Sequence, residues 1–391
     1  MKLIKKITRT LLLLSISQFS IGQIHNTYYQ SIVDNCSISS VTTNLNEFVG
    51  HGVKSVGSSE IDNAKDWLKE KYLSYGYTDI VEDTFTTGGN STTNIVVTKV
   101  GLVYPNTYVI VDGHYDTING VGANDNGSGT TLILEIAKRL ANVPTEYSIK
   151  FINFSAEETG LNGSQHYVNN VVNATSPKLD IRLVLNIDQV GGRSGMTNDT
   201  IICERDTSNP TENNAASNII TNELATCIGL YSSLSTEISY AYSSDYIPFE
   251  NNGEIITGLY EKNETPHSHT ATDVIANMDV NYLFEIIKGS TGAVLNFAVA
   301  SQALNVEENI LGEVKFYPNP AEDFISINSS NLSFKNSKVR LIDLSGKIVY
   351  NRNIVIDTKH HKIALENVSA GVYLLELIIN DDKKTEKIIV Q

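Results

Sequence analysis

Between residues 93 and 300 the chain alternates short runs rich in valine, isoleucine and threonine with stretches whose apolar residues recur at helical spacing. A strand that is followed by a helix and then by another strand favours a parallel sheet with helices on its faces. The sequence therefore predicts an α/β fold in which a mainly parallel central sheet is flanked by helices. The expected strands are 93–100, 107–112, 147–154, 182–188 and 254–260; the expected helices are 58–76 with Ser59 as N-cap, 129–140, 163–171 and 280–300.

The pattern changes after Gln302. Residues 315–391 show no helical stripe, and short β-rich runs separated by turns predict a small all-β sandwich of antiparallel strands. We therefore expect one domain over 23–305, a linker over 306–314 and a second domain over 315–391, with a further polar connector at 84–93. The expected strands after Gln302 are 314–317, 324–328, 338–342, 347–352, 361–365, 371–379 and 384–390.

The N-terminus has the layout of an export signal. Four basic residues precede an apolar run from Leu11 to Ile21 that is too short and too interrupted to span a bilayer. Small residues at Ser20 and Gly22 suit cleavage, so we expect a signal peptide over 1–22 and no transmembrane segment in the mature chain. An N-terminal anchor helix is the alternative.

The chain has 29 basic and 44 acidic residues, a net charge of −15. The excess is concentrated in residues 23–306, which hold 14 basic and 32 acidic side chains. Such a balance repels phosphate groups and argues against nucleic acid or anionic membranes as partners. Of the three cysteines, Cys203 and Cys227 could pair in an exported protein, but buried free thiols fit equally well and Cys36 would remain unpaired.

Two segments place a histidine and carboxylates where a predicted strand ends. The strand 107–112 leads into His114 and Asp116, and ligands bind beyond the carboxyl ends of parallel strands. Asp116 lies two residues on, on the same face, where it can orient a metal-bound imidazole. The strand 147–154 leads into Glu157 and Glu158, which would repel each other unless one binds a cation and the other acts as a base. Solvent-exposed loops are the alternative for both.

Three further segments add oxygen and nitrogen ligands. Asp125 lies in a loop of small residues before a helix, where it could bridge two cations or act as a helix cap. Asp188 ends an apolar strand, and His267 and His269 follow the strand 254–260. All five segments can therefore meet at one edge of one sheet. Mixed histidine and carboxylate ligands favour Zn²⁺ over Mn²⁺ or Co²⁺, and two such ions ~3.5–4 Å apart activate a water and polarise a carbonyl.

The motifs that carry this chemistry resemble metallopeptidase family 28, the di-zinc aminopeptidases of the zinc-exopeptidase fold. The resemblance covers residues 45–300 and rests, in order, on GHYDT, GANDNGSG, SAEETGLNGS, NID and HTATD, which begin at Gly113, Gly122, Ser155, Asn186 and His269. It implies two Zn²⁺ per chain, one held by His114, Asp125 and Asp188 and the other by Asp125, Glu158 and His269. It also implies that Glu157 is the general base, that Asp116 orients His114, and that the peptide bond after Asp125 is cis.

The substrate pocket is less well defined by this resemblance. Asp245 lies in a segment that commonly reads SDH in the family, and Tyr246 stands here in place of that histidine. A tyrosine that stabilises the oxyanion in some members corresponds to Tyr240 or Tyr242. We therefore expect Tyr240, Tyr242 and Asp245 at the substrate.

Residues 315–391 resemble the C-terminal sorting domain of the type IX secretion system of Gram-negative bacteria. The resemblance rests on FYPNP from Phe316, VRLIDLSG from Val339, LENVSAGVYL from Leu365 and KIIV from Lys387. It implies that the type IX machinery is a partner and that the protein passes through the periplasm to the medium or the outer cell surface. An adhesive or carbohydrate-binding sandwich is the alternative.

Together these features predict a secreted zinc aminopeptidase that hydrolyses the first peptide bond of peptides or proteins with a free N-terminus. Two other functions are compatible with the scaffold: a single-zinc acyltransferase similar to glutaminyl cyclases, and a non-catalytic surface binding protein. The complete ligand set favours two metals, and retention of Glu157 argues against a non-catalytic role. Carboxypeptidase or dipeptidase specificity, the preferred N-terminal residue and the oligomeric state stay open at this point.

Overall fold

The structure is a computed structural model that describes residues 25–241, 243–302, 314–328, 334–356, 360–379 and 382–391. The expected signal peptide and, apart from Val314, the expected linker lie outside these residues. The chain divides into two compact units, Met1–Ala303 and Leu304–Gln391. In the described part no helix is both long and apolar enough to cross a membrane.

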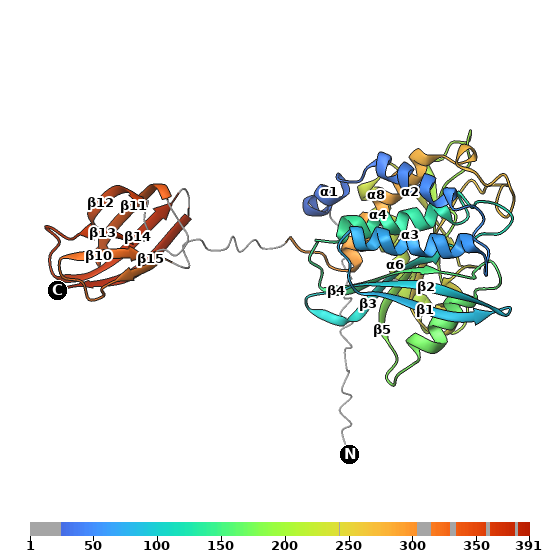
Figure 1. The fold of residues 1–391 in the computed structure, drawn as a ribbon, viewed down its shortest axis with the longest axis horizontal. Coiled ribbons are helices and arrows are strands. Elements are labelled where there is room, and N and C mark those ends of the chain that lie inside the picture. The colour runs from blue at the N-terminus through green and yellow to red at the C-terminus, as the bar shows by residue number, and fades with distance from the viewer. Residues whose placement is uncertain (1–24, 242, 303–313, 329–333, 357–359, 380–381) are drawn as a thin grey trace, which may run out of the picture. The chain divides into compact units, whose positions relative to one another are not determined.

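The first unit is built on one eight-stranded sheet (Figure 1). Its strand order is β1-β2-β4-β3-β5-β8-β6-β7. The four central strands β4, β3, β5 and β8 run parallel, β6 and β7 are parallel to each other, and the β1–β2, β2–β4 and β6–β8 pairs are antiparallel. The strands are β1 Ile80–Thr87, β2 Asn90–Lys99, β3 Tyr104–His114, β4 Tyr147–Phe154, β5 Asp180–Ile187, β6 Thr200–Arg205, β7 Ser235–Tyr240 and β8 Ile256–Glu261.

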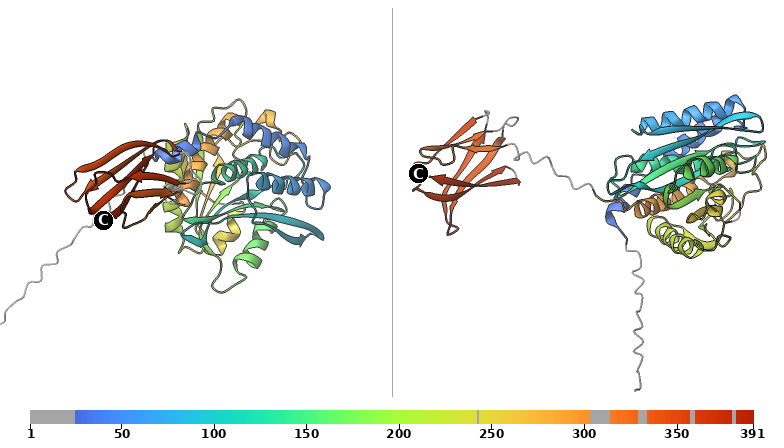
Figure 2. Two further views of the ribbon diagram at one scale, coloured as in Figure 1. Left: turned by 60° about the vertical axis from the view of Figure 1, so that its left-hand side comes forward. Right: turned by 90° about the horizontal axis from the view of Figure 1, so that it is seen from below.

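Helices cover both faces of this sheet, as Figure 2 shows. Alternate strand residues point to opposite faces, so Val109 and Val111 of β3 pack into the larger core while Ile110 packs into the smaller one. The larger core contains side chains of α1 Thr27–Val33, α2 Ile38–Gly50, α3 Ser59–Ser74, α4 Gly127–Leu140, α6 Asn214–Tyr231 and α8 Val280–Phe297. The smaller core contains α5 Asn162–Tyr167, a π-helical turn at Val168–Val172 and α7 Tyr246–Asn251. Burial on both faces explains the continuous apolar runs of the central strands.

The α/β prediction is confirmed, with local corrections. The expected connector 84–93 is instead a hairpin of β1 and β2, which turns at Gly88 and Gly89 with φ of 56° and 83°. Strand β1 is antiparallel and mostly solvent-exposed, so it lacks the apolar run that reveals a buried strand. Helix α3 is capped by Ser58 rather than Ser59, because the Ser58 side chain accepts the N–H of Ile61. The structure also contains elements that the sequence analysis did not predict, including α1, α2, α6, β6 and β7.

The cysteines form no disulfide in this structure. Cys203 and Cys227 are buried, and Cys36 is partly buried. The larger core contains both buried thiols, where they act as small apolar groups.

The second unit consists of two small antiparallel sheets. One has the order β13-β10-β9 and the other β12-β11-β14-β15. A core that includes Val339, Leu341, Leu375, Leu377 and Ile388 holds them together. Each of the seven expected strands has a counterpart: β9 Lys315–Tyr317, β10 Phe324–Asn328, β11 Phe334–Asp343, β12 Ile348–Ile356, β13 His360–Ala364, β14 Gly371–Ile379 and β15 Asp382–Val390.

One buried lysine ties the N-terminal helices to the loop that precedes Asp125. The Nζ of Lys54 donates hydrogen bonds to the carbonyls of Phe48, Gly52 and Val121 at 3.3, 2.7 and 2.9 Å, and it lies 3.9 Å from the centre of the Phe48 ring. Burial lowers the pKa of Lys54 to about 7, while the carbonyls and the ring favour its charged form. The lysine therefore joins α2 to the loop after β3.

Substitution Lys54→Met should destabilise the first unit. The change leaves buried carbonyl groups without donors, which costs about 2–3 kcal/mol of unfolding free energy. Trp67, the only tryptophan of the chain, lies on α3, so its fluorescence during urea unfolding reports on the first unit alone. Lys288→Met is the matched control, because Lys288 forms a partly exposed ion pair with Glu285 whose loss costs less than about 1 kcal/mol. An equal effect of the two substitutions would contradict this assignment.

Candidate metal centre

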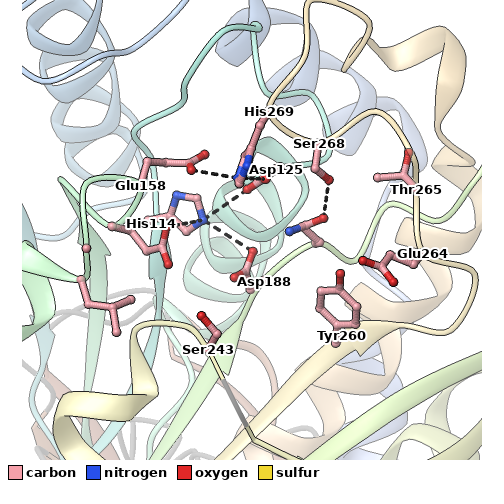
Figure 3. A pocket seen from close by; sticks show the side chains of 14 residues that line it. His114, Asp125, Glu158, Asp188, Ser243, Tyr260, Glu264, Thr265, Ser268 and His269 are labelled. Carbon is pink, nitrogen blue, oxygen red and sulfur yellow. Dashed lines mark hydrogen bonds and ion pairs between the residues drawn. The ribbon is translucent and has the colours of Figure 1, made fainter.

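Loops at the carboxyl ends of the central parallel strands bring the expected ligands together. His114 is the last residue of β3, Asp188 follows β5 directly, and Glu157 and Glu158 follow β4. The loop after β8 contributes His269, and the loop before α4 contributes Asp125. The peptide bond between Asp125 and Asn126 is cis, as the family resemblance implies. The side chains converge on one pocket (Figure 3).

Two groups of side chains are each arranged to hold one cation, and Asp125 belongs to both. In the first group, His114 Nε2 lies 3.4 Å from Asp125 Oδ1 and 3.5 Å from Asp188 Oδ1. In the second, His269 Nε2 lies 3.1 Å from Asp125 Oδ2 and 2.9 Å from Glu158 Oε2. Within each group the candidate ligand atoms all lie within 4.8 Å of one another. His267 instead contacts Thr272 Oγ1 at 2.8 Å and does not line the pocket.

The chemistry of these residues fits divalent cations such as Zn²⁺. Glu158 Oε1 and Asp188 Oδ1 are buried and accept no hydrogen bond, which is costly for a carboxylate without a cation. Each group combines one imidazole with two carboxylates, a set that Zn²⁺ accepts. His114, Asp125 and Asp188 are less than a tenth exposed, whereas the His269 side chain is 52% exposed and faces the pocket opening.

Glu157 lines the same pocket but belongs to neither ligand group. Its Oε2 lies 4.0 Å from His114 Nε2, so it faces the first cation position. The Asp116 carboxylate accepts the main-chain N–H groups of Glu157 and Glu158 at 3.1 and 3.2 Å. Asp116 therefore fixes the turn that presents the two glutamates.

The contact between Asp116 and His114 differs from the prediction. His114 Nδ1 bonds the main-chain carbonyl of Asp116 at 3.1 Å, while the nearest carboxylate oxygen is 3.7 Å away. The carboxylate is already occupied by the two N–H groups of the glutamate turn. The imidazole is still oriented by Asp116, but mainly through the main chain.

Burial and neighbouring charges shift the pKa values of these groups. Burial raises the pKa of Glu157 to about 9 and that of Glu158 to about 8. The hydrogen bond with Asp125 raises the pKa of His269 to about 9. Burial lowers the pKa of His114, but Glu157, Asp125 and Asp188 outweigh it, so that the net shift is well upward. The two glutamates and the two histidines therefore hold protons more strongly than usual, and a bound cation would displace them.

Supporting residues that the sequence analysis did not identify hold the ligand loops. Asp273 accepts the N–H groups of Asn124 and Asp125 at 2.9 and 3.0 Å. Glu261, the last residue of β8, accepts the Asn124 side-chain amide and the N–H groups of Gly192 and Thr265 at 2.9, 2.6 and 2.7 Å. These bonds join the loops that carry Asp125, Asp188 and His269. Asp273 is the last residue of the HTATD motif, so the motif could have identified it. Nothing in the sequence distinguishes Glu261 from other carboxylates at strand ends.

The loop after β7 supports Asp188. The Ser244 hydroxyl donates to Asp188 Oδ2 at 2.8 Å and accepts from the Asn186 amide at 3.0 Å. Neither Tyr240, which is 60% exposed on β7, nor Asp245, which is fully buried at the start of α7, lines the pocket. Tyr242 lies outside the described residues. Of the expected substrate residues, Tyr240 and Asp245 therefore lie outside the lining of this cavity.

Comparison with known proteins identifies the family. Residues 94–294, more than half of the chain, match the model of peptidase family M28. Residues 315–391 match the secretion system C-terminal sorting domain. The chain belongs to peptidase family M28 and has a type IX sorting domain at its C-terminal end.

Individual relatives resemble parts of the chain. Aminopeptidase YwaD of Bacillus subtilis is 33% identical over 176 residues, which cover 44% of this chain and 36% of the relative. The chain thus spans about a third of the length of this relative. The LapA aminopeptidase of Legionella pneumophila is 20% identical and covers 77% of this chain and 81% of its own, with a TM-score of 0.62. A glutaminyl cyclase of Macrostomum lignano is 13% identical, covers 71% and 94%, and has the same TM-score. Both the LapA structure and the glutaminyl cyclase structure share the fold of the part of this chain that they cover.

We expect Zn²⁺ binding to release protons and to strengthen as the pH rises. With pKa values of about 8 for Glu158 and about 9 for His269, both groups are protonated at pH 7 in the metal-free protein and must lose their protons to bind. Apparent Zn²⁺ affinity, measured by competition with a chelator between pH 6.5 and 8, should rise roughly tenfold to a hundredfold per unit.

The Glu158→Gln protein serves as the comparison for this titration. It lacks one of the protons that zinc displaces, so its affinity should be weaker and should change less steeply with pH. A Zn²⁺ affinity of the unmodified protein that does not depend on pH would contradict the assignment of Glu158 and His269 as ligands.

Proposed function

We propose that the protein is an exported zinc aminopeptidase that removes N-terminal residues from peptides. The observation that supports this most strongly is the pair of ligand groups that share Asp125 next to Glu157, which is not needed for metal binding. The site would take two Zn²⁺ ions, one with His114, Asp125 and Asp188 and the other with Asp125, Glu158 and His269. When bound, they would activate a water molecule and polarise the scissile carbonyl.

Glu157 supplies the proton transfers in this mechanism. It accepts a proton from the attacking water and later delivers it to the leaving amine. Burial raises the pKa of Glu157, so it binds a proton more strongly than an exposed glutamate does. Asp116 keeps the Glu157 carboxylate in place through the main-chain bonds of the glutamate turn.

The charge of the pocket favours removal of residues from the N-terminal end. The lining includes the carboxylates of Asp125, Glu157, Glu158 and Asp188, and it contains no lysine or arginine. No lysine or arginine of the lining could therefore pair with the C-terminal carboxylate of a carboxypeptidase substrate, and none would repel a cationic α-amine. The site therefore suits substrates with a free N-terminus.

A single-zinc glutaminyl cyclase remains the alternative enzyme, because a protein with that name shares the fold. That activity would need only one of the two ligand groups. The second group, with Glu158 Oε2 at 2.9 Å from His269 Nε2, favours the two-metal hydrolase.

For export, we propose that residues 1–22 act as a cleaved signal peptide and that residues 306–314 are a linker. The type IX machinery would then act on residues 315–391, which match its sorting domain, and release the protein to the medium or the outer cell surface. Residues 23–305 would form the catalytic domain.

Hydrolysis of aminoacyl-p-nitroanilides and of their N-acetylated forms tests this function. The protein without residues 1–22, loaded with zinc, should cleave only the substrates with a free amine and should contain about two zinc ions per chain. Glu157→Gln should lower kcat by roughly a hundredfold to ten-thousandfold, because it removes the base.

Zinc content provides the control for the Glu157→Gln protein, which should still hold two ions because Glu157 lies in neither ligand group. A fully loaded protein that cleaves no free-amine substrate would contradict the proposal. Cyclisation of an N-terminal glutaminyl peptide by a protein that holds one zinc would favour the alternative.

A further inference from the structure

The pocket extends beyond the ligands in two directions. It has a volume of about 480 Å³. Its lining includes Gly160 and Leu161, which follow Glu157 and Glu158 on the same loop. Across the pocket from Glu158 and His114 lie the side chains of Tyr260, Glu264 and Ser268 (Figure 3). Together with Gln189, which Ser268 contacts, we call them the acidic subsite.

The proposed function, on which this inference rests, assigns a different part of the substrate to each side. Glu157 delivers a proton to the leaving amine, so the departing peptide must lie on the side of Glu157. The first residue lies on the other side of the scissile carbonyl. Its side chain therefore extends towards the acidic subsite.

The acidic subsite is poorly suited to an aliphatic side chain. Leu161 is the only leucine, isoleucine or valine among the described residues that line the pocket, and it belongs to the loop that carries Glu157 rather than to the acidic subsite. Burial of a leucine side chain gains free energy in proportion to the apolar surface it contacts. In the acidic subsite a leucine would contact mainly amide, hydroxyl and carboxylate groups.

Glu264 gives the subsite its charge. It is the only carboxylate of the pocket that is neither a candidate ligand nor the candidate base. The structure gives its exposed carboxylate no hydrogen bond and no ion pair with any described residue. Nearby Lys262 is engaged with Glu237 at 2.6 Å and does not line the pocket.

The remaining groups fit a long cationic side chain. The Tyr260 ring offers a flat apolar surface for the methylene groups of a lysine or arginine, whose charge then reaches Glu264. The Gln189 amide is fixed by Ser268, whose hydroxyl donates to its Oε1 at 2.6 Å. The charge of residues 23–306, with 14 basic and 32 acidic side chains, also attracts cationic peptides.

From this geometry we propose that the enzyme prefers substrates whose N-terminal residue is lysine or arginine, and that Glu264 determines this preference. The preference is a difference in transition-state binding, so it is measured as a ratio of kcat/KM values. It concerns the first residue alone, because the acidic subsite lies on the side opposite the leaving peptide.

The test compares p-nitroanilides of lysine, arginine, leucine and methionine with the zinc-loaded protein and its Glu264→Gln variant. The unmodified protein should cleave the lysine and arginine substrates with kcat/KM values about tenfold or more above that of leucine. Glu264→Gln should lower the two basic substrates roughly fivefold or more and leave leucine within about twofold, because only a charge interaction is lost. Added salt should weaken the preference of the unmodified protein but not that of the variant.

Glu212→Gln is the matched control, because Glu212 is an exposed carboxylate of the same unit outside the pocket. It should leave all four kcat/KM values unchanged. Preference for leucine, an equal loss for all four substrates in Glu264→Gln, or no change in that variant would each overturn the selectivity. Failure to cleave any of the four substrates would instead overturn the proposed function and the selectivity with it.

Discussion

The site depends on the shared position of Asp125 between two histidines. One of its carboxylate oxygens lies 3.4 Å from His114 and the other 3.1 Å from His269. Asp188 and Glu158 complete the two groups, and Glu157 brings a further carboxyl group. So many carboxylates in a largely buried pocket are unfavourable without protons or cations. The raised pKa values of Glu157 and Glu158 reflect first their burial and then the neighbouring carboxylates, and buried oxygens without hydrogen bonds reflect the same lack of solvent.

Several contacts within the first unit hold the loop of Asp125 in place. Asp273 accepts the main-chain N–H of Asn124, and Glu261 accepts its side-chain amide. Lys54 binds the carbonyl of Val121 at the start of the same loop. The loop passes so close to that of His269 that a Cβ on Gly120 would lie 2.0 Å from the Thr270 carbonyl oxygen. The rigid parallel strands beneath place the remaining ligands at one edge of the sheet. Within this fixed frame, the exposed side chain of Glu264 is in neither ligand group and can determine specificity without disturbing the ligands.

The ligands that directly follow buried strands could be predicted from the sequence, because such strands have a recognisable local pattern. His114, Asp188 and the two glutamates follow apolar strands that are buried on both faces, so their convergence could be predicted from topology alone. Strand β1 could not be predicted, because it is largely exposed and lacks an apolar run. The support from Glu261 and Ser244 could not be predicted either, because it depends on contacts between segments far apart in sequence. For the same reason the carboxylate of Asp116 was assigned to His114, although the glutamate turn occupies it.

Anomalous X-ray diffraction at the zinc edge, from crystals of the zinc-loaded protein, would locate the bound ions. We expect two peaks ~3.5–4 Å apart. One should contact His114 and Asp188, the other Glu158 and His269, and both should contact Asp125. A single peak, or zinc bound away from Asp125, would contradict the account.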